Sequence, residues 1–221
     1  MTSDRSENIK NIGVIGAGQM GSGIAHVCAL AGYQVRLTDV DAAALDNAVQ
    51  VIDRNLTRQV GRGVVSDADK NAAMRRIKTG AGYEMFGDCE VVIEAATEKE
   101  EIKREIFKKL VPMLKSDAII ASNTSSISIT RLAASTDRPD RFIGMHFMNP
   151  VPVMALVELI RGIATDEKTF ATVRDLAIHI GKKPVAAEDF KCGTSFLKIS
   201  RFTSSRSVAA SMTKSQSSKS L

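Results

Sequence analysis

Residues 11–39 read N-I-G-V-I-G-A-G-Q-M-G-S-G-I-A-H-V-C-A-L-A-G-Y-Q-V-R-L-T-D, and this stretch predicts a strand, a tight turn, a helix and a second strand. The apolar run over 12–15 suits a strand that is buried on both faces. The helix should end at Gly32, because glycine commonly follows the last helical residue. The alternation over 34–38 predicts the second strand, and Asp39 stands at its carboxyl end.

The turn carries the spacing G-x-G-x-x-G at Gly16, Gly18 and Gly21. The first glycine permits a tight turn, the second allows a pyrophosphate to approach the backbone, and the third allows the helix to pack closely against the strand. Unpaired N–H groups and the positive end of the helix dipole favour a diphosphate there. Glycines also occur in such turns for packing alone, but here the flanking strand, the helix and Asp39 agree. The stretch therefore predicts a dinucleotide site formed by Gly16, Ala17, Gly18, Gln19, Met20 and Gly21.

Asp39 indicates which dinucleotide is bound. A carboxylate at the end of the second strand can accept hydrogen bonds from both hydroxyls of an adenosine ribose. A 2′-phosphate would lie against this negative charge, so the sequence favours NAD over NADP. Arg36 lies in the same predicted strand, three residues earlier, and is not expected to bind a 2′-phosphate.

The composition is that of an ordinary soluble globular protein. The 221 residues can bury one sizeable core, and the shares of hydrophobic residues (44%) and charged residues (25%) are close to average. No apolar run approaches the roughly 18 residues of a membrane-spanning helix. The first eight residues, M-T-S-D-R-S-E-N, are too polar for a secretory signal. The three cysteines share no close spacing, so we expect neither a disulfide framework nor a metal site, and we expect a cytoplasmic location.

The net charge of +5 does not indicate nucleic-acid binding. Residues 191–221 carry six cations and no acid, so the remaining 190 residues sum to −1. This tail also holds ten serines, and its composition predicts disorder. The main body has no basic stripe interleaved with aromatic residues. We therefore expect neither a nucleic-acid partner nor a membrane partner.

The rest of the chain alternates between predicted strands and helices. Further strands are expected over 89–96, 118–121, 141–146, 155–160 and 184–187, and helices over 97–114 and 166–180. A helical excursion over about 41–78 comprises one helix capped by Asp41 and a second helix in which Met74 and Ile77 face inward. This alternation predicts an α/β fold with a doubly wound, mostly parallel sheet.

Ligands of such sheets bind beyond the carboxyl ends of the strands, so polar residues there are candidates by position. They are Asp39, Glu98, Ser122, Asn123, Ser125, His146 and Asn149. His146 ends a predicted strand, and Glu158 lies twelve residues later in an otherwise apolar strand. A buried carboxylate needs a partner, and an imidazole held by a carboxylate at one nitrogen can take a proton at the other. The spacing leaves a catalytic pair and a satisfied structural pair equally open.

Four segments carry a resemblance to one family. They are G-A-G-Q-M-G-S-G-I-A at 16–25, I-E-A-A-T-E at 93–98, A-S-N-T-S-S-I-S-I-T at 121–130 and G-M-H-F-M-N-P-V-P-V-M-A-L-V-E at 144–158. In these segments the chain resembles the L-3-hydroxyacyl-CoA dehydrogenases, over roughly residues 8–190. The resemblance is nearest to the short-chain members that act on 3-hydroxybutyryl-CoA and acetoacetyl-CoA. It implies a Rossmann-type NAD-binding domain and transfer of a hydride between NAD and C3 of an (S)-3-hydroxyacyl-CoA.

Roles for individual residues follow from the resemblance. It implies that His146 is the general base for the 3-hydroxyl proton, that Glu158 orients it, and that Ser125 hydrogen-bonds the substrate oxygen. The residues that match family positions near the cofactor, besides the glycine turn and Asp39, are Glu98, Lys103 and Asn149. Two plainer interpretations stay open: Ser125 as a turn or cap residue, and Lys103 as an ordinary charge on a helix surface.

The resemblance also implies a site for the CoA part of an acyl-CoA substrate. Family members bind CoA phosphates at the helical excursion, where this chain has a basic helical face. The candidate residues for CoA are Asn55, Arg58, Arg62 and, near the acyl group, Ser125. The alternative is that these arginines form an ordinary solvated helix face.

The resemblance stops near Phe190. Family members continue into a helical domain that closes the active site and forms a homodimer, whereas here the composition changes abruptly into the tail at 191–221. A shifted reading frame or a misjoined gene would produce such a change, and a genuine lineage-specific tail is the alternative. We expect residues 1–190 to form a single NAD-binding domain that is truncated relative to the family. Such a chain should keep some NAD affinity but show little or no turnover.

Two other functions are compatible with the sequence. The chain could be a non-catalytic NAD-binding remnant or a structural protein of the same fold. A β-hydroxyacid dehydrogenase with another substrate would share the fold too. Enzymes of that type use a catalytic lysine on a later helix rather than a histidine at a strand end, so the sequence favours them least.

Overall fold

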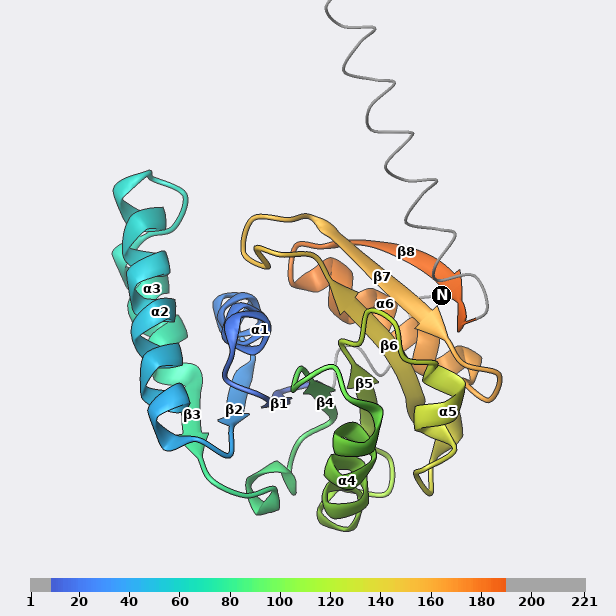
Figure 1. The fold of residues 1–221 in the computed structure, drawn as a ribbon. Helices are drawn as coiled ribbons and strands as arrows, with labels where there is room; N and C mark the ends of the chain where they lie inside the picture. The colour runs from blue at the N-terminus through green and yellow to red at the C-terminus, as the bar shows by residue number, and fades with distance from the viewer. Residues whose placement is uncertain (1–8, 190–221) are drawn as a thin grey trace, which may run out of the picture. The chain divides into compact units, whose positions relative to one another are not determined.

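An eight-stranded sheet runs through residues 9–189, the part of the chain that the computed structural model describes (Figure 1). Its strands are β1 (Asn11–Ile15), β2 (Gln34–Thr38), β3 (Ile77–Gly80), β4 (Val91–Glu94), β5 (Ile119–Ser122), β6 (Phe142–Phe147), β7 (Leu156–Arg161) and β8 (Lys183–Glu188). The predictions for the first eight residues and for the tail at 191–221 lie outside the described residues.

The strands are arranged in the order β3-β2-β1-β4-β5-β6-β7-β8, and neighbouring strands run parallel except for the antiparallel pair β6–β7. The chain builds outward from β1 to β3, then returns to β4 on the other side of β1 and builds outward again. This confirms the doubly wound, mostly parallel α/β fold predicted from the alternation of elements. The reversal between β1 and β4 marks the point where such sheets bind ligands.

The connecting helices are α1 (Gln19–Leu30), α2 (Ala42–Gly61), α3 (Asp67–Arg76), α4 (Glu100–Leu110), α5 (Ile129–Ala133) and α6 (Glu167–His179). Helices α1 and α6 share one hydrophobic core, to which Cys28 and Leu176 both belong. On the opposite face, Phe107 of α4 packs edge-on against Phe142 of β6, with ring centroids 5.0 Å apart. Both faces of the sheet are thus covered, which explains why its central strands are almost wholly apolar.

The alternation of side chains along the strands decides which polar groups share a face. A Cβ on Gly144 would meet Ile129 of α5, so Gly144 faces the side of α4 and α5. His146 lies two residues later in β6 and therefore points to the same side. Glu158 lies directly opposite His146 in β7 and shares that face.

The predicted helical excursion differs from the structure at its end. Asp41 caps α2 as predicted, since its side chain accepts a hydrogen bond from the Ala43 N–H at 2.9 Å. The prediction that Ile77 faces inward from a helix is wrong: α3 ends at Arg76, and Ile77 begins the edge strand β3, paired with Val35. The strand reads I-K-T-G, which is too short to show the alternation of a half-buried strand.

The predicted helix over 97–114 is also shorter in the structure. Helix α4 ends at Leu110, and a 3₁₀ turn, Val111–Met113 (η3), follows because Pro112 cannot continue an α-helix. Within residues 9–189, none of the helices combines the length and the apolar character needed to cross a membrane.

Candidate active site

The glycine turn between β1 and α1 has the backbone geometry that its sequence predicts. Gly16 has a φ of +97°, a conformation that favours glycine, and a Cβ there would lie 2.7 Å from the Ala95 carbonyl oxygen. A Cβ on Gly21 would lie 1.7 Å from the Gly16 carbonyl oxygen, so α1 can pack against β1 only with glycine at 21. A Cβ on Gly18 would meet no described heavy atom within 4 Å. Packing of the described residues therefore gives no reason for glycine at 18, and its backbone is open to a ligand.

The N-terminus of α1 offers backbone donors at this opening. Gly18 is the N-cap residue, and no side chain of the described residues caps the helix. The N–H groups of Gln19 and Met20 lie in the first turn, where a helix has no acceptor of its own. A helix end of this kind binds anions such as a diphosphate.

Asp39 lies beside the turn and helps to hold it. Its Oδ2 accepts a hydrogen bond from the Ala17 N–H at 2.6 Å, and its Oδ1 accepts one from the Asp41 N–H at 3.0 Å. Further lone pairs on both oxygens remain for ligand hydroxyls. Arg36 is engaged elsewhere, since its Nη2 lies 2.6 Å from Asp88 Oδ2. The charges near Asp39 thus suit a ribose with free hydroxyls better than one that carries a 2′-phosphate.

A cavity of about 910 Å³ lies over the carboxyl ends of β2, β1 and β4. Its lining includes Gly16, Gly18, Asp39, Val40, Ala96 and Ile102. Val40 is fully exposed and Ile102 is 41% exposed, so apolar side chains border the polar turn. An apolar wall beside a carboxylate and a row of backbone donors fits the adenosine diphosphate half of a dinucleotide. The residues present therefore fit a nicotinamide dinucleotide cofactor.

The predicted contact between His146 and Glu158 forms. His146 Nδ1 lies 2.9 Å from Glu158 Oε2, and the side chains are 17% and 4% exposed. An ionised carboxylate can only accept, so Nδ1 carries the hydrogen and Nε2 is left to accept a proton. The second oxygen, Glu158 Oε1, is buried and has no hydrogen-bond partner among the described residues. This geometry can hold an imidazole in one tautomer for acid–base chemistry.

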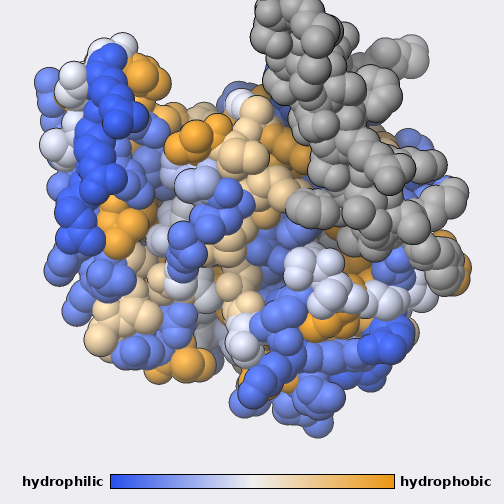
Figure 2. Space-filling model, turned by 45° about the horizontal axis from the view of Figure 1, so that its top comes forward, coloured by the Kyte–Doolittle hydropathy of each residue, from blue (hydrophilic) through white to orange (hydrophobic). Residues whose placement is uncertain are grey.

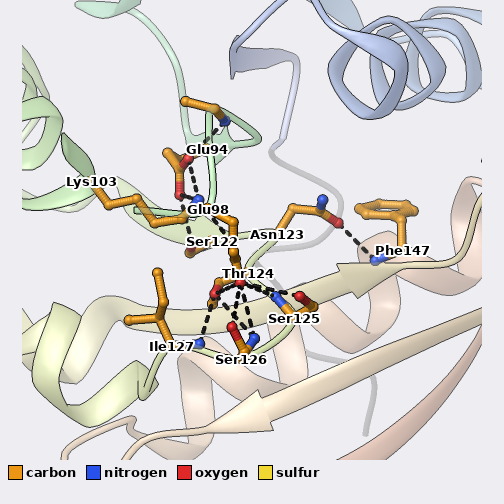
Figure 3. A network of polar contacts seen from close by, with 11 residues as sticks. Glu94, Glu98, Lys103, Ser122, Asn123, Thr124, Ser125, Ser126, Ile127 and Phe147 are labelled. Atoms are coloured by element: carbon orange, nitrogen blue, oxygen red, sulfur yellow. Dashed lines mark hydrogen bonds and ion pairs between the residues drawn. The ribbon is translucent and has the colours of Figure 1, made fainter. Parts of the chain in front are cut away.

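Glu98 ties the start of α4 to the serine-rich turn that follows β5 (Figure 3). Its Oε1 accepts hydrogen bonds from Thr124 Oγ1 at 2.6 Å and from the N–H groups of Ser125 and Ser126 at 2.8 and 3.0 Å. Ser125 Oγ lies 3.2 Å from the same oxygen. Partial burial acts in the opposite direction, but these hydrogen bonds and the nearby Lys103 ammonium lower the pKa of Glu98 to about 2. The ionised carboxylate therefore fixes the turn that carries Ser125.

Lys103 is a buried charge, which overturns the interpretation of it as an ordinary helix-surface residue. Its side chain is 1% exposed, and Nζ donates to both oxygens of Glu94, at 2.7 and 2.9 Å (Figure 3). Glu94 also accepts from Ser122 Oγ at 2.6 Å and from the Ala96 N–H at 2.7 Å. Lys103 Nζ lies 3.6 Å from Glu98 Oε2 as well. Sequence reasoning missed Glu94, although an acid that ends the buried run V-V-I-E requires a partner.

Two asparagines follow the strand ends near this network. Asn123 follows β5, and its Oδ1 accepts a hydrogen bond from the Phe147 N–H at 2.9 Å. Asn149, which the family resemblance assigns to the cofactor site, is exposed in the loop after β6. It precedes Pro150 in a cis peptide bond.

The residues predicted to bind CoA lie at one end of α2. Asn55 and Arg58 belong to the helix, and Arg62 is its C-terminal cap residue. Both arginines are exposed, and Arg58 Nη1 lies 3.5 Å from Asn55 Oδ1. Figure 2 shows the α2–α3 side of the domain, at the left, as mainly hydrophilic. Such a face is able to bind phosphates and is equally typical of a solvated helix.

The doubly wound sheet, the glycine turn and the acid after β2 together define a nucleotide-binding domain of the Rossmann type. The sequence profile of the family described as 3-hydroxyacyl-CoA dehydrogenase, NAD binding domain, matches residues 11–190. The chain belongs to this family. It therefore carries the NAD-binding domain of that family.

The chain is similar to several proteins in sequence and in structure. A 3-hydroxybutyryl-CoA dehydrogenase of Bradyrhizobium diazoefficiens is 57% identical over 182 residues, which cover 82% of this chain and 62% of that protein. A probable 3-hydroxybutyryl-CoA dehydrogenase of Deinococcus radiodurans is 46% identical over 178 residues, covering 80% of this chain and 64% of that protein. The crystal structure of (S)-3-hydroxybutyryl-CoA dehydrogenase from Ralstonia eutropha matches with a TM-score of 0.80 and 47% identity, covering 82% of this chain and 64% of that chain. This chain thus spans less than two thirds of the length of these relatives.

Proposed function

We propose that the chain is the NAD-binding part of a dehydrogenase that transfers a hydride between NAD and C3 of a short-chain (S)-3-hydroxyacyl-CoA. The names of the relatives suggest 3-hydroxybutyryl-CoA and acetoacetyl-CoA as the substrate pair. The single observation that carries the proposal is the His146–Glu158 contact. It lies at the carboxyl end of β6, on the same side of the sheet's parallel strands where the glycine turn follows β1. An acid–base pair beside a nucleotide site is what oxidation of an alcohol requires.

The cofactor would supply the hydride acceptor. The chain would hold the cofactor at its diphosphate and at its adenosine ribose. The backbone of the turn from Gly16 to Gly21 would bind the diphosphate, and Asp39 would accept from the adenosine ribose. The proposed cofactor residues are Gly16, Ala17, Gly18, Gln19, Met20, Gly21, Asp39, Glu98, Lys103 and Asn149. Because Lys103 is buried against Glu94, we propose that it acts by fixing the carboxylate of Glu98.

His146 would take the proton of the 3-hydroxyl group at Nε2 and return it in the reverse reaction. Glu158 would keep the ring oriented through Nδ1 and stabilise the imidazolium that forms. Ser125, whose backbone N–H is held by Glu98, would hydrogen-bond the substrate oxygen through its hydroxyl group, which would turn from Glu98 Oε1 toward the substrate. The CoA phosphates would lie against the helix face formed by the exposed Arg58 and Arg62 and the half-buried Asn55.

The test separates cofactor binding from turnover. Titration of the 221-residue chain with NADH, followed by fluorescence, should show saturable binding, and NADPH should bind more weakly because of Asp39. We expect little acetoacetyl-CoA-dependent oxidation of NADH by this chain. Much of the rate of hydride transfer depends on exclusion of water and on positioning of the substrate, and this chain spans only 62% of the Bradyrhizobium relative.

A chimera tests the chemistry itself. In it, the part of the Bradyrhizobium relative that follows the matched region replaces residues 191–221. This chimera should oxidise NADH with acetoacetyl-CoA, and His146→Gln should reduce its rate by about 100-fold or more. A folded chimera that binds NADH without turnover would instead favour a non-catalytic NAD-binding remnant. Absence of NADH binding to a folded chain would contradict the proposal entirely.

A further inference from the structure

Asn123 lies where the ends of three strands meet. Its N–H donates to the carbonyl oxygen of Glu94 at 2.7 Å, and its Oδ1 accepts from the Phe147 N–H at 2.9 Å. Backbone pairing between β5 and β6 stops at Ser122, which is paired with Gly144. The side chain of Asn123 thus supplies a hydrogen-bond acceptor to β6 beyond the last paired residue. This bond holds the residue next to His146.

The same bond decides which way the amide group points. A backbone N–H can only donate, so the atom of Asn123 that faces Phe147 must be the oxygen. The nitrogen Nδ2 then points away from β6, as Figure 3 shows. Among the described residues, none accepts a hydrogen bond from Nδ2. Two N–H donors of Asn123 are therefore available at the carboxyl end of β5.

The order of the strands places these donors on one particular side of the nucleotide site. Asp39 follows β2, and β2 lies on one side of β1. Strands β4 and β5 lie on the other side, and Asn123 follows β5. A dinucleotide with its diphosphate at the glycine turn and its adenosine ribose at Asp39 would extend its other half toward β4 and β5. The donors of Asn123 would then face the nicotinamide half.

We propose that Asn123 is a positioning residue that connects the cofactor to the acid–base pair. Through Oδ1 it holds the end of β6 that carries His146, and through Nδ2 it binds an acceptor oxygen of the nicotinamide nucleotide half. One amide group would then set the distance between the nicotinamide ring and the imidazole. This inference rests on the proposed function and adds a residue to it.

Two substitutions distinguish the contact of Asn123 with β6 from its contact with the cofactor. Asn123→Asp keeps an acceptor for the Phe147 N–H but removes the Nδ2 donors, whereas Asn123→Ala removes both. The exposed residue Asn47 on α2 provides the control, Asn47→Asp, which adds the same charge elsewhere. NADH binding is measured by fluorescence, and binding of ADP, which lacks the nicotinamide half, is measured by calorimetry.

Loss of one hydrogen bond should weaken NADH binding to both Asn123 variants by about tenfold and leave ADP binding within about twofold. Asn123→Ala should also lower the thermal midpoint by about 2–4 °C, because the Phe147 N–H loses its acceptor, and Asn123→Asp should not. The control should match the unmodified chain in all three measurements.

Unchanged NADH binding by a folded Asn123→Asp variant would overturn the inference. An equal loss of NADH and ADP affinity would overturn it too, since the effect would then be repulsion of the diphosphate by the new charge. If one variant fails to fold, the ratio of NADH to ADP affinity in the other decides. A folded wild-type chain that does not bind NADH would contradict the proposed function itself, and this inference with it.

Discussion

His146 and Glu158 occupy directly opposite positions in the antiparallel pair β6–β7, and their side chains meet with Nδ1 2.9 Å from Oε2. Opposite residues in such a pair have their Cβ atoms about 4.5–5.5 Å apart on the same face. The contact is thus fixed by the register of the sheet rather than by a loop. A slip of one residue would place the two side chains on opposite faces, so the fold and this pair are specified together.

Glu158→Gln should separate chemistry from binding. The amide keeps the shape of the side chain but removes the charge that stabilises the imidazolium, so we expect the rate of NADH oxidation by the chimera to fall by about 100-fold. NADH affinity should change by less than about twofold, because the glycine turn and Asp39 are unaltered. The exposed residue Glu167 on α6 offers a matched control, Glu167→Gln. A parallel loss of rate and NADH affinity would argue against the acid–base role.

Two glycines of the turn should respond differently to alanine. Around Gly18 the described residues leave room for a methyl group, so Gly18→Ala should keep the thermal midpoint within about 2 °C. It should nevertheless weaken NADH binding by about tenfold or more, because the methyl group occupies the place of the pyrophosphate. Gly21→Ala should lower stability and binding together, since its Cβ would overlap the Gly16 carbonyl oxygen. Normal NADH affinity in Gly18→Ala would show that the diphosphate does not lie at this turn.

The buried pair Glu94–Lys103 should be costly to break from one side. Lys103→Met leaves the Glu94 carboxylate buried without its counter-charge, so we expect the free energy of unfolding in urea to fall by about 3–5 kcal/mol. The double variant Glu94→Gln with Lys103→Met should recover part of this loss, because glutamine is neutral and still accepts from the Ala96 N–H. Lys108→Met, on the exposed side of α4, should change stability by about 0.5 kcal/mol or less. If the double variant is no more stable than Lys103→Met, the unpaired charge of Glu94 is not the cause of the lost stability.

Glu98 should make part of the stability depend on pH. The pKa of Glu98 is about 2 in the folded chain, below the ordinary glutamate value of 4.5, so folding favours the ionised form. The resulting stability is fully present above about pH 4.5 and is lost as the pH falls toward 2. The gap in thermal midpoint between the unmodified chain and Glu98→Gln should therefore be constant from about pH 7 to pH 5.5 and should shrink below about pH 4.5. Glu105→Gln, an exposed change on the same helix, should leave a small gap without this trend.

Much of this arrangement could be predicted from local sequence. The glycine spacing between two apolar runs predicted β1, α1 and β2 as the structure has them, since Gly16 and Gly21 each meet a local backbone requirement. An acid inside the apolar run of β7 predicted a partner, and His146 is that partner. The predictions failed where the signal was short or distant. The four residues of β3 have too little pattern to be distinguished from the end of a helix.

The doubly wound sheet and the dinucleotide turn could be predicted from the sequence alone, because these features depend on residue spacing within one or two elements. Which polar groups share a site is visible only in the folded chain. Lys103 is nine residues from Glu94, and Phe147 lies 24 residues from Asn123, yet each pair is in hydrogen-bond contact. Such contacts depend on the register of neighbouring strands and on which face a helix covers. Spacing along the chain does not contain that information, because strands that are buried on both faces read as continuous apolar runs without an alternation that would fix their register.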